Sequence, residues 1–246
     1  MKTIYKLILI ATLVFLVGWQ TNKANMILTE SVHIDKVGER IAFISSKFID
    51  TPYMARTMKG SPDDKEELVI NLDGMDCFTF LDYVEALRLS VRVDNFIENL
   101  KKVRYFNGEV NYAKRKHFFT DWVSGENNTV RDITSGLPGA TTVEKIINRK
   151  SDKTNWLKNV PQTMRMVNYI PGNQVSKDVI KLLQTGDYIG IYSDKQGLDV
   201  THTGIFIKNK KGEFFRNTSS KLMKVTDYPF KDYVKEIKGI IVFRPQ

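Results

Sequence analysis

The spacing of apolar residues changes along this chain, from helical spacing in the N-terminal half to strand-like runs near the C-terminus. Residues 35–48 place their apolar side chains on one face at helical spacing, which predicts an amphipathic helix. Residues 77–91 have the same spacing and predict a second helix. Helices that precede an antiparallel sheet are typical of the α+β class, so we expect an α+β fold.

The expected sheet comes from runs of β-branched and aromatic residues that polar turns separate. The turn at residues 209–212, Asn-Lys-Lys-Gly, predicts that the strands on either side of it form a hairpin. The runs that predict strands are residues 186–193, 202–208, 213–219 and 237–244.

The middle of the chain gives weaker signals. A further helix is expected to be capped by Asn95, with Glu98 three residues on, and to end at Asn107 and Gly108. The middle third, residues 109–180, is the least readable by these patterns, and the segment 145–180 could be an elaboration of the domain. We find no repeat or linker, so one domain over residues 25–246 is expected. The remaining expected elements are a short buried strand at 68–70 and helical pieces at 143–149 and 176–184.

The N-terminus has the layout of a secretory signal peptide. Lys2 and Lys6 precede an apolar run at residues 7–17, which is short for a membrane span, and polar residues follow up to Ala24. We predict that residues 1–24 are removed and that the remaining chain is exported to the periplasm or outside a bacterial cell, free of the membrane. An uncleaved anchor is the alternative, because Asn22 is not the small residue expected before the cleavage site.

The net charge of +9 favours anionic neighbours such as wall polymers, phospholipid headgroups or nucleic acid. The lysines are scattered and no nucleic-acid motif is present, so we predict no nucleic-acid partner. The chain has no clustered metal ligands, no glycine-rich phosphate loop and no G-x-S-x-G turn. We therefore expect neither a metal nor a cofactor, and the oligomeric state stays open.

The chain has a single cysteine, Cys77. Exported proteins usually pair their cysteines, so a lone one is a buried inert residue, half of an intermolecular bridge, or a reactive thiol. Cys77 lies at the expected N-terminus of a helix, with Asp73 and Asp76 where capping residues belong. Free N–H groups and the helix dipole there lower a thiol pKa and can receive an oxyanion. We therefore expect Cys77 to be a catalytic nucleophile.

Among the three histidines, His202 is the best candidate for a general base. It begins an expected strand, and Gly204 on the same face leaves room for a helix end or a substrate. The hairpin brings His202 near the position opposite Asn217, whose amide could orient the imidazole. His33 is expected to be structural or solvated. His117 could line a cleft or hold the scaffold.

Three separated stretches of the chain resemble the NlpC/P60 superfamily, and more closely its branch long known as domain of unknown function 1460. The resemblance runs from about residue 35 to the C-terminus. It implies a papain-like fold, in which a helical N-terminal half carries the nucleophile at a helix N-terminus and packs on a C-terminal antiparallel sheet. The stretches are residues 51–53 with 67–80, residues 117–122, and residues 197–204 with 216–220.

By position, the resemblance implies that Cys77 is the nucleophile and His202 the general base, and that the Tyr53 hydroxyl helps the oxyanion site. The family usually has a histidine at the third catalytic position, and here it is Asn217, followed by Thr-Ser-Ser. Its amide oxygen can still accept the imidazole N–H, but it carries no charge. We expect Asp76 and His117 on the substrate side of this site.

The resemblance also implies a peptidoglycan substrate. For this branch the implied reaction is that of an N-acetylmuramoyl-L-alanine amidase that prefers 1,6-anhydro muropeptides. The closest alternative is a γ-D-glutamyl-diamino acid endopeptidase with the same site. A non-catalytic wall-binding protein and an exported redox or disulfide-bridged protein are the alternatives from other classes.

Overall fold

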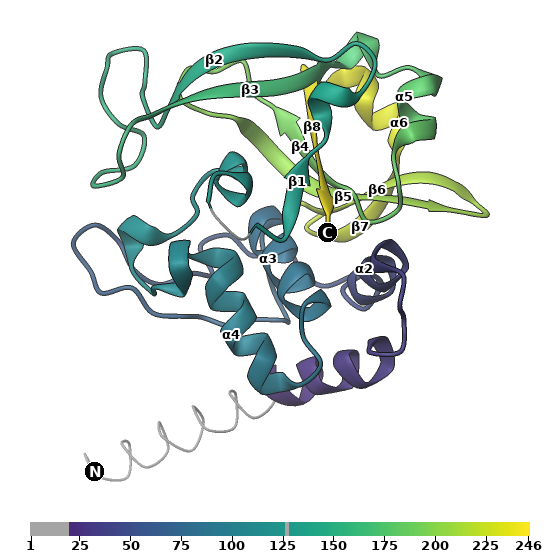
Figure 1. Cartoon of the computed structure of the whole chain (residues 1–246). Coiled ribbons are helices and arrows are strands. Elements are labelled where there is room, and N and C mark those ends of the chain that lie inside the picture. Colours follow the sequence, from purple (N-terminus) through teal and green to yellow (C-terminus); the bar gives the residue numbers. More distant parts are fainter. Residues whose placement is uncertain (1–19, 126–127) are drawn as a thin grey trace.

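The computed structural model describes residues 20–125 and 128–246. Helices gather on one side of a strongly curved antiparallel sheet, as Figure 1 shows. The helices on this side are α2 (Val37–Ser46), α3 (Cys77–Arg88) and α4 (Val93–Arg104), and residues 20–31 are helical as well. The α+β fold class expected from the sequence is confirmed.

The sheet has eight strands, and every strand pair in it is antiparallel. Its order is β2-β3-β8-β4-β5-β6-β7, with β1 paired to β8. The strands are β1 (Val130–Asp132), β2 (Thr141–Ile147), β3 (Thr163–Pro171), β4 (Tyr188–Tyr192), β5 (Val200–Asn209), β6 (Gly212–Ser219), β7 (Lys224–Pro229) and β8 (Gly239–Pro245).

Both faces of the central strands are buried. Along β5, Ile205 and Ile207 belong to the core cluster shared with α2, α3 and α4, whereas Phe206 between them packs into a second cluster. Strand side chains alternate between the two faces, so one strand supplies both clusters. The second cluster lies under α5 (Lys177–Leu182) and α6 (Phe230–Tyr233). The described part also contains 3-10 helices at Phe106–Gly108, Tyr112–Lys114, Phe119–Val123, Thr134–Gly136, Gly172–Gln174 and Val234–Glu236.

The central helix α3 packs against α2, α4, β5 and β6. A buried ion pair joins it to α4, Asp82 with Arg104 at 2.8 Å, and a second one within the helix, Glu85 with Arg88 at 2.6 Å, orients Arg88 to donate to the Gln246 carbonyl. The hydroxyl of Tyr188 in β4 donates to Glu85 at 2.7 Å. Buried charges are tolerated when they are paired and hydrogen-bonded, so these contacts set where the helix lies against the sheet.

Most elements expected from periodicity are present. Helices α2, α3 and α5 and strands β4, β5, β6 and β8 lie within or beside the expected ranges. The hairpin between β5 and β6 is confirmed, with Asn209 paired to Gly212. The break after α4 is confirmed too, since Asn107 and Gly108 both have positive φ.

The predicted helix at 143–149 is wrong. Residues 141–147 form β2, which pairs with β3 along its whole length. Lys145 and Ile147 are buried on one face of the strand, and Ile146 between them is less buried. This alternation is typical of a strand. The apolar run is too short to distinguish a helix from a strand by spacing alone.

Two smaller predictions are also wrong. Helix α4 begins at Val93, so Asn95 lies inside the helix and does not cap it. Residues 68–70 form no strand. The carbonyl of Val69 instead accepts a hydrogen bond from the Arg104 guanidinium at 2.8 Å, so a side chain takes the place of a strand partner.

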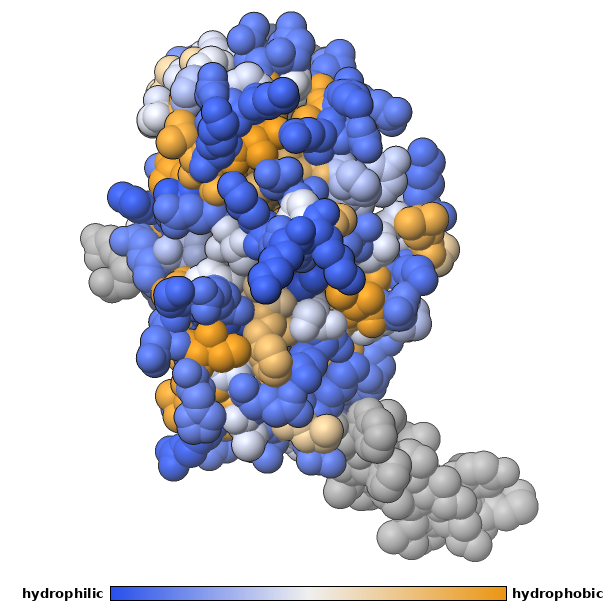
Figure 2. Space-filling view, turned by 90° about the vertical axis from the view of Figure 1, so that its right-hand side faces the viewer, coloured by the Kyte–Doolittle hydropathy of each residue, from blue (hydrophilic) through white to orange (hydrophobic). Residues whose placement is uncertain are grey.

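Most of the predicted signal peptide lies outside the described residues. The helical residues 20–31 bury Ala24, Ile27 and Leu28 in the core beside the other helices. No helix in the described part of the chain is long and apolar enough to cross a membrane. The face in Figure 2 is mostly hydrophilic, with apolar residues in small separate groups, as is ordinary for a protein surface.

Candidate active site

The N-terminus of α3 is fixed by a capping box. Asp76 Oδ1 accepts hydrogen bonds from the backbone N–H groups of Phe78 at 3.1 Å and Thr79 at 2.8 Å. The Thr79 hydroxyl in turn accepts from the Asp76 N–H at 3.0 Å. The predicted capping role of Asp76 is therefore present, and Cys77 is the first residue of the helix.

Capping changes which groups can receive an oxyanion. Phe78 and Thr79 direct their N–H groups to Asp76, so these donors are already used. The Cys77 N–H donates none of the hydrogen bonds to other residues found in the described part of the chain. The Cys77 N–H interacts with the residue's own sulfur and is the backbone donor that the Asp76 cap leaves available at this helix end, fewer than a bare helix terminus would provide.

The thiol of Cys77 is not activated in the way expected from the helix dipole. Burial, and to a smaller extent the charge of the neighbouring Asp76 carboxylate, raise its pKa to about 11. The N–H and hydroxyl of Thr203 act in the opposite direction but do not offset burial. Desolvation of a thiolate outweighs the partial charge of one helix end, so the sulfur holds its proton at neutral pH.

His202 and Asn217 meet across strands β5 and β6. Their Nε2 and Oδ1 atoms are 3.0 Å apart, and the Asn217 Nδ2 donates to the Phe215 carbonyl at 3.2 Å. Because an amide oxygen can only accept, Nε2 of His202 carries the proton and Nδ1 is the basic nitrogen. Burial lowers the pKa of His202, although the Asn217 hydrogen bond and the Asp76 charge raise it. The imidazole is thus a neutral base.

Thr203 joins the helix to the strand that carries the base. Its hydroxyl donates to the Cys77 carbonyl at 2.9 Å, and the side chain is buried. This contact places the start of α3 next to the residue that follows His202. Thr203 was not predicted from the sequence. The feature that could have indicated it is a small hydroxyl residue directly after the candidate base.

Gly204 has a different role from the one expected. A Cβ atom there would lie 2.5 Å from the Phe215 ring and 2.6 Å from the Arg216 carbonyl. The glycine therefore leaves room for strand β6, and not for a helix end or a substrate. This close approach of β6 is what brings Asn217 to the imidazole.

Two tyrosines lie near the sulfur. Tyr53 is half-buried, its two chain neighbours are hydrogen-bonded to Met75, and its N–H donates to the Met223 carbonyl at 3.0 Å. Burial raises its pKa, and the charges of Asp76 and Cys77 contribute. Burial and the charge of Cys77 raise the pKa of Tyr233 to about 12. Tyr233 was not predicted, because only folding brings α6 to the helix end.

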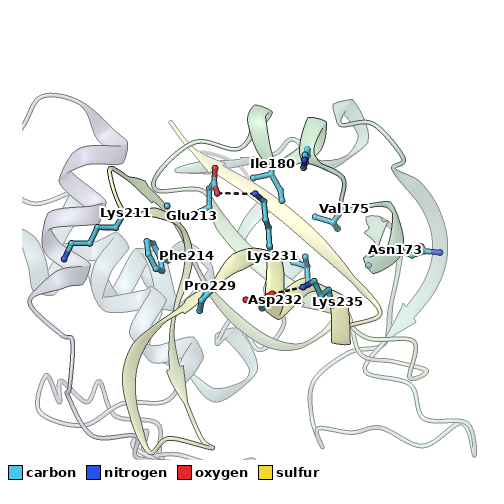
Figure 3. Close-up of a pocket in the computed structure, with 14 residues that line it drawn as sticks. Asn173, Val175, Ile180, Lys211, Glu213, Phe214, Pro229, Lys231, Asp232 and Lys235 are labelled. Atoms are coloured by element: carbon cyan, nitrogen blue, oxygen red, sulfur yellow. Dashed lines mark hydrogen bonds and ion pairs between the residues drawn. The ribbon is translucent and has the colours of Figure 1, made fainter.

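A cavity of about 430 Å³ opens beside His202 and Asn217. Tyr228, Tyr233 and Leu222 form apolar and aromatic walls in it, and serine hydroxyls and carboxylates add polar groups. A larger cavity of about 730 Å³ lies across α6, with Asp232 lining both (Figure 3). It contains neither Cys77 nor a histidine, and its Lys235 is paired with Asp232 at 2.7 Å. The smaller cavity is the one that His202 and Asn217 line, and Cys77 lines neither of the two.

His117 lies apart from this constellation. Its Nε2 is 2.8 Å from the Tyr112 carbonyl, and its ring packs edge-on against Tyr112. Burial lowers its pKa to about 4, and its hydrogen bond and its ring contact both go to Tyr112 and not to Cys77, His202 or Asn217. The structure therefore gives His117 a scaffold role and does not bring it to the predicted substrate side. His33 is exposed.

No group of three or more His, Cys, Asp or Glu side chains within residues 20–125 and 128–246 could hold a metal ion. Cys77 is a free thiol. What the arrangement offers is a protonated thiol, a neutral imidazole oriented by an amide, a free backbone N–H and phenol hydroxyls. These are the groups that acyl transfer through a thioester requires.

Comparison with solved structures supports this fold. A crystal structure of an N-acetylmuramoyl-L-alanine amidase from Bacteroides uniformis matches with a TM-score of 0.74 and 29% identity, over 85% of this chain and 99% of that chain. A Legionella pneumophila protein of family DUF1460 matches with a TM-score of 0.77 and 23% identity, over 93% of this chain and 95% of that one, and shares the fold.

Among curated proteins, no sequence matches this chain. A family model does match, over residues 43–240, and its range includes the capped helix start, the candidate base and its amide partner. The chain therefore belongs to the AmiA-like family, described as N-acetylmuramoyl-L-alanine amidase-like.

Proposed function

We propose that this protein is an exported bacterial cysteine hydrolase that cleaves the amide bond between N-acetylmuramic acid, in its 1,6-anhydro form, and L-alanine. The family is that of amidase-like peptidoglycan hydrolases. The observation that carries the cysteine mechanism is the hydrogen bond between His202 and Asn217, next to a strand residue that bonds the Cys77 carbonyl.

The reaction begins with a proton transfer from the Cys77 thiol to Nδ1 of His202. The thiolate attacks the lactyl carbonyl, and in this proposal the Cys77 N–H and the Tyr53 hydroxyl stabilise the oxyanion. His202 then protonates the departing amine of L-alanine, leaving a thioester on Cys77. A water molecule that gives its proton to His202 hydrolyses the thioester and releases the acid.

The raised thiol pKa favours this order of events. A thiol that is protonated at neutral pH needs a base at the moment of attack, and His202 is neutral and oriented to serve. Asn217 holds the imidazole by its amide oxygen, as the sequence led us to expect. An uncharged amide stabilises the imidazolium less than a carboxylate would, so this pair works through orientation.

The cavity beside His202 supports a sugar-bearing acyl group. The Tyr228 and Tyr233 rings offer flat apolar surfaces, and Ser219, Ser220 and Glu236 offer partners for hydroxyl groups. Its volume of about 430 Å³ is within the range of small-molecule sites. Export rests on the N-terminal pattern of lysines followed by an apolar run.

The test is mass spectrometry of disaccharide and 1,6-anhydro-disaccharide tetrapeptides incubated with the protein and with its Cys77→Ala variant. Free tetrapeptide plus the sugar acid, absent with the variant and formed faster from the anhydro substrate, is the expected result. Release of a fragment that begins at the diamino acid would assign the endopeptidase reaction instead.

Two further measurements distinguish a hydrolase from a non-catalytic wall-binding protein and from a disulfide-bridged protein. No product from any substrate, together with a Cys77 thiol inert to iodoacetamide at all pH values tested, would point to wall binding without catalysis. A dimer that a reducing agent separates on a gel would point to a disulfide-bridged protein. The variant should keep its melting temperature, so that loss of product is assigned to chemistry.

A further inference from the structure

The helical residues 20–31 are docked on the loop that precedes the nucleophile. We call residues 71–76 the nucleophile loop. The Gln20 side chain accepts from the Leu72 N–H at 2.7 Å and donates to the Asp73 carboxylate at 2.7 Å. The Lys23 ammonium donates to the Leu72 carbonyl at 2.8 Å and to the Asp73 carboxylate at 2.7 Å. Two side chains thus hold both backbone groups of one loop residue.

The helix that makes this contact is part of the folded core, and the contact itself lies at the edge of that core. Ala24, Ile27 and Leu28 on the same helix are buried in the main core cluster. The Lys23 ammonium also lies 5.8 Å from the centre of the Phe48 ring, and its side chain is 27% exposed. A half-buried ammonium with a carboxylate and a carbonyl as partners is held more firmly than an exposed ion pair.

The nucleophile loop connects the helical residues 20–31 to the reactive groups of the site. Within it, Met75 pairs with both neighbours of Tyr53: its N–H donates to the Pro52 carbonyl and its carbonyl accepts from the Met54 N–H. The next residue, Asp76, caps α3 and so sets where Cys77 lies. A shift at Leu72 and Asp73 would move both the oxyanion donor and the sulfur.

We propose that Gln20 and Lys23 are positioning residues for the nucleophile loop and that the active exported protein retains both. Removal of the chain up to Ala24 would delete all four of these hydrogen bonds and one buried core residue. Leader processing therefore falls before Gln20 and not at Ala24. The effect on turnover rests on the proposed function, but the effect on the thiol does not.

The first experiment determines the N-terminal residue of the protein exported from cells that express the full chain, by mass spectrometry of its N-terminal peptide. A first residue at or before Gln20 is the expected result. An exported, fully active protein that begins at Asn25 would overturn the proposal.

The second experiment compares full-chain variants. Lys23→Met and Gln20→Ala each remove two of the four hydrogen bonds. Each should lower kcat at least about fivefold, the factor that one ordinary hydrogen bond corresponds to, while KM changes little. Iodoacetamide should alkylate Cys77 about fivefold faster, because a displaced loop exposes the sulfur. Lys23→Arg, which keeps the charge and the donors, should restore both values.

Glu30→Gln is the matched control, because it removes the ion pair of the same helix with Lys47, which follows α2, and leaves the loop untouched. It should leave kcat and the alkylation rate unchanged. Equal values for Lys23→Met and the wild type in both assays would refute the positioning role. If the wild type hydrolyses no muropeptide, the proposed function fails, and the alkylation rates alone still decide the role of Gln20 and Lys23.

Discussion

The Nε2 atom of His202 lies 3.0 Å from the Oδ1 atom of Asn217, and the two residues belong to adjacent strands of one hairpin. The asparagine is buried, and its amide nitrogen is tied to the Phe215 carbonyl. Both ends of the amide are therefore hydrogen-bonded, and the amide oxygen orients the imidazole through Nε2. An uncharged residue thus stands where the family usually has a histidine.

Removal of this amide should slow the reaction. Asn217→Ala leaves the imidazole without its partner, and we expect kcat/KM on an anhydro-muropeptide to fall about tenfold to a hundredfold, a loss of about 1.4–2.7 kcal/mol in transition-state stabilisation. Asn173→Ala, which changes an exposed asparagine, is the control. Unchanged kinetics in Asn217→Ala would show that this hydrogen bond does not orient the base.

The pH dependence of kcat/KM and of Cys77 alkylation should distinguish a neutral thiol–imidazole pair from a thiolate–imidazolium ion pair. Because the pKa of His202 is lowered from 6.5, kcat/KM should rise with pH through a value below 6.5 and then stay level. Alkylation of Cys77 in the free protein should keep rising towards pH 11, since its thiol pKa is about 11. An alkylation rate that is already level from pH 5 to 8 would instead indicate a preformed thiolate.

Gly204 should tolerate no side chain. Gly204→Ala puts a Cβ against the Phe215 ring and the Arg216 carbonyl, so strand β6 must shift and carry Asn217 with it. We expect the free energy of unfolding to fall by about 1–3 kcal/mol and kcat to fall as well. Gly136→Ala meets nothing within 4 Å and is the control. Urea denaturation and steady-state kinetics measure the two effects.

The ion pair between Asp82 and Arg104 should be important for stability. Both side chains are buried, and Asp82→Asn would leave the guanidinium without its counter-charge. The free energy of unfolding should fall by about 3–5 kcal/mol in urea denaturation. In contrast, Asp178→Asn breaks an exposed pair with Lys181 and should cost at most about 1 kcal/mol. Equal losses in the two variants would contradict the role of burial.

The sequence by itself determined the parts of the site that depend on short-range geometry. The capping box joins Asp76 and Thr79 three residues apart, so the helix start at Cys77 could be predicted. The turn after Asn209 fixes the register of β5 against β6, and this register brings His202 and Asn217 together. Local hydrogen bonds and one tight turn were sufficient for these predictions.

Only the tertiary structure decided the features that depend on distant segments. The high pKa of Cys77 comes from burial under β5, and Tyr233 reaches the site from α6. Strand β2 took its form from pairing with β3, against a short apolar run that also suited a helix. The docking of Lys23 on Asp73 joins segments fifty residues apart. Burial and long-range pairing depend on which surfaces meet, and residue spacing does not encode that.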